Sequence, residues 1–224
     1  MFYVLLVCII ILLLLYSSDA NIPKIIHQTA PADTSKWKKE WFECQESWKK
    51  LHPDFEYKMW TDEDLDDFMK TEYPEHYDMY RSYDANIKRI DAVRYFILYT
   101  YGGIYADMDY KCQHRFFEEL PGDKVSIAES NHVYDEGFQN ALMVSPARHS
   151  FWENVIHGLP ETKHEEYVVA CTGPRFLSRH VKMNITNIHT LDLKNFNPYY
   201  EKTDSPDNYR NAKTIHLNTG SWQS

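Results

Sequence analysis

A helical pattern of hydrophobic and polar positions covers residues 85–101. Its apolar positions recur at spacings typical of one helix face, namely Ala85, Ile90, Val93, Ile97 and Tyr101. Asp91 and Arg94 are three residues apart and share a different face of this helix. Ser82 and Asp84 carry side-chain oxygens that can accept from the first backbone N–H groups, which predicts a capped helix start.

A short strand follows this helix and ends in two carboxylates. Gly102 or Gly103 can adopt the left-handed conformation that ends a helix. Apolar and polar positions then alternate, with Ile104, Ala106 and Met108 set against Tyr105, Asp107 and Asp109. If the strand persists through this run, Asp107 and Asp109 lie on the same side about 6.6 Å apart, at ~3.3 Å per residue. The rest of the chain is organised around this helix, glycine pair and strand.

Two neighbouring carboxylates repel each other, so their pairing favours a bound cation. Mn²⁺ and Mg²⁺ prefer oxygen ligands, and one or two carboxylates plus substrate phosphates complete their coordination. The alternative is a solvated acidic turn, because a bare D-x-D sequence is common. Asp107 and Asp109 directly follow the helix–Gly-Gly–strand unit, and this context favours the metal site.

The same reasoning predicts further elements on both sides of this unit. Helices are expected at residues 36–51, 61–69, 116–120, 151–157 and 175–180. Strands are expected at residues 22–28, 55–60, 125–129, 140–144, 185–191 and 214–217, and residues 194–213 are expected to form a loop or lid. His27 and Gln28 follow apolar residues at the end of the first strand, where ligands collect in open α/β sheets.

The composition excludes a disordered chain and argues against a nucleic-acid partner. The 224 residues are 43% hydrophobic and 15% aromatic, which suits one folded domain with a core. The net charge is −9 and the basic residues form no stripe. Cys8, Cys44, Cys112 and Cys171 include no C-x-x-C pair, so a zinc site is not expected, and the last three allow at most one internal disulfide.

The first residues of the chain form an apolar segment. Residues 1–16 span about 24 Å as a helix at ~1.5 Å per residue, short of a ~30 Å hydrocarbon core. Ser18-Asp19-Ala20 resembles a signal-peptidase site, so a signal peptide and a signal anchor both stay open for residues 1–20. Either predicts the secretory lumen (ER or Golgi), where Asn184-Ile185-Thr186 is a potential glycosylation site. An anchor would associate the domain with a membrane and suit a lipid-linked acceptor.

Six segments, in order, resemble one known family. The run IKRIDAVRYFILYTYGGIYADMDY at residues 87–110 resembles the signature of the D-x-D glycosyltransferases of family 32. The other five are IPKIIHQTA (22–30), HPDFEYKMWTDED (52–64), NALMVSPARHSFW (140–152), TGPRFLS (172–178) and HLNTGSW (216–222). The family includes initiating mannosyltransferases and inositol-phosphoceramide mannosyltransferases. Ala30 stands where the family often has Trp, which puts one nucleotide-side contact in doubt.

The resemblance implies a fold and a set of site residues. The fold is α/β and GT-A-like (Rossmann-like), with a mixed, mostly parallel sheet flanked by helices in a single catalytic domain, residues 21–224. The implied metal ligands are Asp109, Asp107 (through water) and His216. The implied contacts with the nucleotide-sugar donor come from His27, Gln28, Asp107, Ser221 and Trp222, while Asp91 and Arg94 grip the donor sugar and phosphate.

The resemblance also implies a reaction. The expected activity is a retaining, metal-dependent transfer of a hexose to a glycan or lipid head group, with Mn²⁺ or Mg²⁺ as cofactor and GDP-mannose as the first choice of donor. A UDP-galactose or UDP-glucose donor and a non-catalytic sugar-binding module are the alternatives. A phosphohydrolase is disfavoured, because one D-x-D and a distant His are sparse for a two-metal site. No residue is identifiable from sequence as a catalytic nucleophile.

Overall fold

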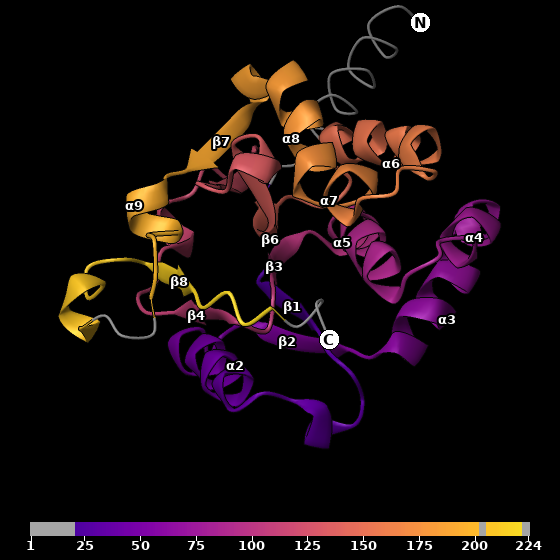
Figure 1. The fold of residues 1–224 in the computed structure, drawn as a ribbon. Helices are drawn as coiled ribbons and strands as arrows, with labels where there is room; N and C mark the ends of the chain where they lie inside the picture. Colours follow the sequence, from indigo (N-terminus) through magenta and orange to yellow (C-terminus); the bar gives the residue numbers. More distant parts are fainter. Residues whose placement is uncertain (1–20, 202–204, 221–224) are drawn as a thin grey trace, which may run out of the picture.

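The computed structural model describes residues 21–201 and 205–220, and its centre is a six-stranded sheet (Figure 1). The strand order is β2-β1-β3-β6-β5-β7. The bounds are β1 (Ile25–Thr29), β2 (Glu56–Trp60), β3 (Gly103–Ala106), β5 (Val125–Glu129), β6 (Phe138–Ser145) and β7 (Ile188–Leu191). Three of the five pairings are parallel, and the two that involve β6 are antiparallel. A second sheet pairs β4 (Tyr110–Cys112) with β8 (Thr214–His216) in antiparallel register.

Helices cover both faces of the central sheet (Figure 1). They are α2 (Lys39–Leu51), α3 (Asp62–Glu72), α4 (Pro74–Arg81), α5 (Asn86–Tyr101), α6 (Ser150–Thr162), α7 (Val168–Cys171), α8 (Pro174–Met183) and α9 (Leu193–Phe196). Tyr105, Ile127 and Met143 face a core built with α3, α5, α6 and α8. Their neighbours Ile104 and Leu142 face the opposite core, which includes Trp48 of α2 and Phe196 of α9. This period-2 alternation is what a sheet buried on both sides requires.

The predicted fold class, an α/β fold with a mixed and mostly parallel sheet in one domain, is confirmed. The predicted helix before the glycine pair is also confirmed, but its predicted cap is wrong. Ala85 is the N-cap residue and no side chain caps it, because Asp84 instead forms an ion pair with Lys88 at 3.0 Å. At the start of α3, Thr61 and Asp64 form a reciprocal capping box.

Gly102 and Gly103 connect α5 to β3 at a point where there is no room for a side chain. Gly102 has a φ of 62° and Gly103 a φ of 87°, both in the region that favours glycine. A Cβ on Gly103 would lie 2.5 Å from the carbonyl oxygen of Ile25. The pair therefore lets α5 end directly against β1, and β3 enters the sheet parallel to β1 without a longer loop.

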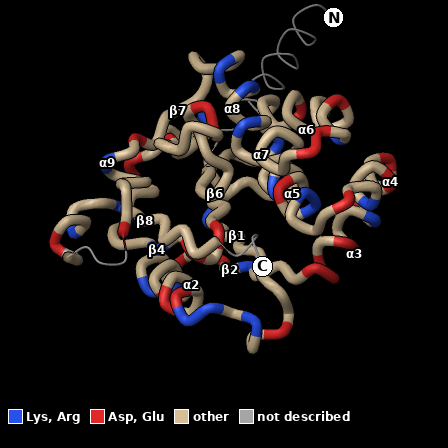
Figure 2. The backbone as a smooth tube through the Cα atoms, in the orientation of Figure 1, with Lys and Arg blue, Asp and Glu red and all other residues tan. Residues whose placement is uncertain are grey.

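Several elements escaped the periodicity analysis. These are α4, α7, α9, β4 and a set of short 3₁₀ turns, and α9 occupies the start of the segment 194–213 that was predicted as a loop or lid. The predicted strand at residues 185–191 begins with a 3₁₀ turn and becomes β7 only at Ile188. Cys44, Cys112 and Cys171 are buried free thiols. Acidic and basic positions are interspersed along the described chain, and acidic residues gather on α3 (Figure 2). None of the helices in the described part is long and apolar enough to cross a membrane, and the apolar segment 1–16 lies outside that part.

Candidate active site

The two carboxylates lie in a turn, which corrects the prediction that they continue a strand. Strand β3 ends at Ala106, and the backbone N–H of Tyr110 donates to the carbonyl of Asp107 at 2.9 Å. The N–H of Asp107 donates to the carbonyl of Ala141, also at 2.9 Å. The Asp107 carbonyl also accepts from Gln28 Nε2 at 3.2 Å. Gln28, at the carboxyl end of β1, thus holds the D-x-D backbone in place.

A buried ion-pair network holds the Asp107 carboxylate in position. Arg94 on α5 is only 2% exposed, and its guanidinium lies 2.7 Å from Asp91 Oδ1 and 3.2 Å from Asp107 Oδ1. It also donates to the Asn140 carbonyl at 2.8 Å. Tyr105 donates its hydroxyl to the same Asp107 oxygen at 3.0 Å. In this structure Arg94 therefore orients Asp107, and its predicted contact with the donor stays a prediction, as does that of Asp91.

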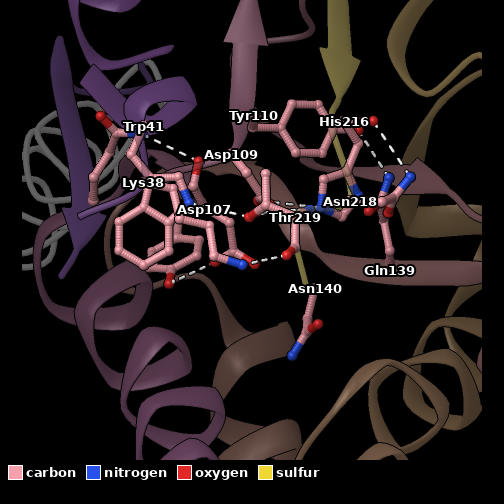
Figure 3. Close-up of polar contacts among 12 residues, drawn as sticks. Lys38, Trp41, Asp107, Asp109, Tyr110, Gln139, Asn140, His216, Asn218 and Thr219 are labelled. Atoms are coloured by element: carbon pink, nitrogen blue, oxygen red, sulfur yellow. Dashed lines mark hydrogen bonds and ion pairs between the residues drawn. The ribbon is translucent and has the colours of Figure 1, made fainter. Parts of the chain in front are cut away.

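Asp109 faces the C-terminal part of the chain. Its Oδ1 lies 3.3 Å from His216 Nε2, and its Oδ2 accepts from Thr219 N at 2.8 Å and Thr219 Oγ1 at 3.0 Å (Figure 3). The His216 ring stacks on Tyr110 with centroids 4.8 Å apart. The structure therefore brings together two of the predicted metal ligands, although they are more than a hundred residues apart in the sequence.

Thr219 is in turn held by the start of α2. The ring N–H of Trp41 donates to Thr219 Oγ1 at 3.1 Å, and the Lys38 ammonium donates to the Thr219 carbonyl (Figure 3). Asn218, with a φ of 48°, makes the left-handed bend before it. Sequence reasoning missed Asn218 and Thr219 because neither belongs to a charged motif, and the HLNTGSW segment was their only signal. Ser221 and Trp222, predicted to contact the donor, lie outside the described residues.

Burial and charge shift the ionisation of these groups in opposite directions. Burial raises the pKa of Asp91 to about 6, although Arg94 works against it. Burial likewise raises the pKa of Asp107. Burial acts to raise the pKa of Asp109. The charge and hydrogen bond of His216, together with the hydrogen bonds from Thr219, outweigh it and hold that pKa well below its usual range. Burial works to lower the pKa of His216, but the Asp109 carboxylate raises it above its usual value. Asp109 is therefore the most firmly ionised carboxylate of the site.

His27 is not part of this site, which corrects the placement predicted for it. The side chain is fully buried between Trp60 and Tyr101. One ring nitrogen lies 3.0 Å from the Gly102 carbonyl and the other accepts from Trp60 Nε1 at 3.2 Å. Burial lowers the pKa of His27 to about 4, so the ring is neutral at physiological pH. Both ring nitrogens are engaged, so His27 supports the α5–β3 turn.

The side chains of this site partly match the ligands that a divalent cation such as Mn²⁺ requires. A firmly ionised carboxylate and an imidazole 3.3 Å apart are oxygen and nitrogen ligands of the kind that Mn²⁺ accepts. Asp107 offers a further carboxyl that is 29% exposed, but one of its oxygens is engaged by Arg94. Within the described ranges, no group of three or more His, Cys, Asp or Glu side chains forms a complete metal-binding cluster. The remaining ligands would have to come from substrate, and the three-residue ligand set stays a prediction.

The fold and the D-x-D turn at the edge of its sheet define a class of protein. Residues 38–130 match the family described as the glycosyltransferase sugar-binding region containing a DXD motif. The fold is similar to that of the PaToxG glycosyltransferase, with a TM-score of 0.59 and 14% identity over 74% of this chain and 70% of that one.

Relatives that are similar in sequence carry more specific names than the family description. The chain is 41% identical over 170 residues to inositol phosphoceramide mannosyltransferase 3 of Schizosaccharomyces pombe, which covers 73% of this chain and 46% of the relative. It is 42% identical over 162 residues to mannosyl phosphorylinositol ceramide synthase CSH1 of Saccharomyces cerevisiae, with 70% and 42% covered. The chain thus spans less than half the length of either curated relative.

Proposed function

We propose that this protein is a metal-dependent glycosyltransferase that moves a hexose, mannose from GDP-mannose, to a hydroxyl of a lipid head group. The observation that carries the proposal is the convergence of Asp107 and Asp109 with His216 at the carboxyl end of β1 and β3. In open α/β sheets this is the edge at which ligands bind. A sugar-nucleotide donor brings the diphosphate that would complete the coordination of a cation at Asp109 and His216.

Each residue of the site would have a separate role in the reaction. A bound Mn²⁺ or Mg²⁺ would stabilise the charge that collects on the leaving diphosphate. Asp109 and His216 would hold it, while Thr219 orients Asp109. Asp107, fixed through Oδ1 by Arg94 and Tyr105, would bind a donor hydroxyl through its second carboxylate oxygen. Ser221 and Trp222 belong to the proposal through the motif resemblance alone, and retention of anomeric configuration rests on the same resemblance.

The names of the relatives support the choice of donor and acceptor. They describe transfer of mannose to inositol phosphoceramide, which is a polyol phosphate carried on a lipid. A lipid acceptor agrees with the apolar residues 1–16, through which we propose an association with the membranes of the secretory pathway. UDP-galactose and UDP-glucose stay in the donor panel because no described residue distinguishes the nucleotide bases.

Donor hydrolysis tests the proposal without knowledge of the acceptor. The full chain, purified in mild detergent, is incubated with GDP-mannose, UDP-galactose and UDP-glucose, with Mn²⁺ or with a chelator. We expect Mn²⁺-dependent hydrolysis of GDP-mannose that falls at least about a hundredfold in Asp109→Asn, because that variant loses the charge at the cation. The control is Asp78→Asn, an exposed acid on α4.

Two results would overturn the proposal. Turnover of UDP-galactose or UDP-glucose without turnover of GDP-mannose would show a glycosyltransferase that uses a different donor from the one proposed. Tight Mn²⁺-dependent nucleotide-sugar binding without any turnover, even with inositol phosphoceramide added in mixed micelles, would favour a non-catalytic sugar-binding module.

A further inference from the structure

The loop between β5 and β6, residues 130–137, is a compact structure beside the site and has no role in the reaction as described so far. Its base is closed by a hydrogen bond from Ser130 N to the Gly137 carbonyl at 2.9 Å. Inside it, Ser130 Oγ donates to Asp135 Oδ2 at 2.5 Å and accepts from His132 N at 3.1 Å. The loop carries one 3₁₀ turn, Val133–Asp135, so its shape is set by its own contacts.

Helix α8 fixes the loop from the other side. Ser178 Oγ donates to the Asp135 carbonyl at 2.6 Å and accepts from Phe138 N at 3.0 Å. Arg175 Nε donates to the Tyr134 carbonyl at 2.9 Å. These bonds hold the loop backbone on both sides of Asp135, so the carboxyl of Asp135 has a defined position without any ligand.

The strand that follows the loop contacts both halves of the site. Directly after the loop, Gln139 donates to the hydroxyl of Tyr110, on which His216 stacks, at 2.8 Å. The next residue, Asn140, accepts the 2.8 Å hydrogen bond from Arg94. Asp135 also interacts electrostatically with both His216 and Asp91. Asp135 therefore lies near the region that a sugar held by Asp107 and Asp109 would occupy.

The same loop exposes two large apolar side chains. Val133 is 79% exposed and Tyr134 is 64% exposed, next to a carboxyl whose residue is half-buried. Within the described ranges, the Asp135 carboxyl receives its one hydrogen bond from Ser130, on Oδ2, which leaves Oδ1 able to accept from a ligand. A carboxylate at the site and apolar side chains just outside it match an acceptor that has hydroxyl groups at one end and hydrocarbon at the other.

We propose that residues 130–137 form the acceptor-binding loop, in which Asp135 accepts a hydrogen bond from a ring hydroxyl of a polyol head group while Val133 and Tyr134 contact the adjoining lipid chains. This inference rests on the proposed function, because it requires a donor site next to the loop. It deepens that function by assigning the residues that select a lipid-borne acceptor. A charge-assisted hydrogen bond from a hydroxyl to a carboxylate is among the stronger polar contacts available for such selection.

The test separates use of the donor from use of the acceptor. The full chain is assayed with GDP-mannose and Mn²⁺ against two acceptor probes, inositol phosphoceramide in mixed micelles and soluble myo-inositol 1-phosphate, and the ratio of transfer to hydrolysis is recorded for each. We expect Asp135→Asn to lower this ratio at least about tenfold with both probes. We expect the double variant Val133→Ser/Tyr134→Ser to raise KM for the micellar probe alone. Met183→Ser, which changes a residue 72% exposed at the end of α8, is the control and should leave both ratios unchanged.

Failure of this inference is distinct from failure of the proposed function. If the wild-type chain transfers mannose and Asp135→Asn keeps the wild-type ratio, the loop is not the acceptor site although the function stands. If hydrolysis and transfer fall together in Asp135→Asn while thermal unfolding is unchanged, Asp135 belongs to the donor site and the inference is equally overturned. Binding to the lipid-bearing micelles is measured in parallel. If the wild-type chain turns over no donor, the inference still predicts weaker micelle binding by Val133→Ser/Tyr134→Ser than by Met183→Ser, and equal binding would overturn it.

Discussion

Arg94→Leu is the substitution that best tests the buried network behind the D-x-D turn. Arg94 is enclosed at 2% exposure and pairs with two carboxylates, Asp91 at 2.7 Å and Asp107 at 3.2 Å. Removing one partner of a buried ion pair costs about 3–5 kcal/mol, because the remaining charge is left desolvated and unpaired. The free energy of unfolding of a domain is about 5–15 kcal/mol, so the variant should lose a large part of it.

The loss should depend on pH in a defined direction. The pKa of Asp91 is raised by burial to about 6 in the folded state. An unfolded Asp titrates near about 3.9, so the folded state binds this proton more tightly and ionisation of Asp91 costs stability as pH rises through that window. Without the charge of Arg94, the folded-state pKa of Asp91 rises further. The difference between wild type and Arg94→Leu should therefore be larger at pH 8 than at pH 5.

Urea unfolding followed by tryptophan fluorescence measures this difference at both pH values. The control is Arg81→Leu, which breaks an exposed 2.9 Å pair with Asp66 and should cost at most about 1 kcal/mol. Because Arg94→Leu could fail to fold, Arg94→Leu/Asp91→Asn is made as well. It removes one of the two orphaned charges, while Asp107 keeps the other, and it should regain part of the loss. Equal losses in Arg94→Leu and Arg81→Leu, or a pH 5 deficit as large as that at pH 8, would refute the reasoning.

Three further predictions follow from single contacts. Gly102→Ala should lower the free energy of unfolding by at least about 2 kcal/mol, because its Cβ would meet Ala147 N at 2.5 Å; Gly137→Ala, with open space around it, should cost less, and the reverse order in urea unfolding would contradict this. The Cys44 thiol is fully buried, and burial raises its pKa to about 12. Its alkylation should therefore be at least about a hundredfold slower in the native chain than in the unfolded chain, as measured by mass spectrometry of the peptide that contains Cys44. Thr219→Val removes a hydroxyl that bonds both Asp109 and Trp41, and should reduce Mn²⁺-dependent donor hydrolysis about tenfold with little change in thermal unfolding; full activity would show that Thr219 does not orient Asp109.

The sequence predicted strand β5 and helix α5 correctly, although each is buried on more than one face: residues 125–128 of β5 and residues 91–98 of α5 are buried without interruption. Helix α4 was missed because Tyr80 is its one buried residue, which leaves no apolar stripe to detect. The D-x-D segment was predicted as strand because its alternation is the same in a strand and in a turn. The bond from Tyr110 N to the Asp107 carbonyl closes the turn, and the alternation of residue types does not reveal it.

The site was predictable as a set of motifs but not as a set of contacts. Asp109 and His216 were chosen from separate motifs, and the structure places them 3.3 Å apart. The placement of His27 was wrong because a polar residue at a strand end looks the same from sequence whether it meets solvent or Trp60. Thr219 and Asp135 carry no pattern of their own, and their importance arises from what the closed chain brings beside them.

The contact between Thr219 and Asp109 also orders events in time. It joins residues 110 positions apart, so the chain must close a long loop before the second carboxylate is oriented. Synthesis delivers Asp109 before β6, and Thr219 only after β1, β3 and β6 are available to pair. All six strands of the central sheet therefore precede in the chain the residue that orients Asp109. Docking of residues 216–219 against Asp109 is the late step of folding that fixes this carboxylate.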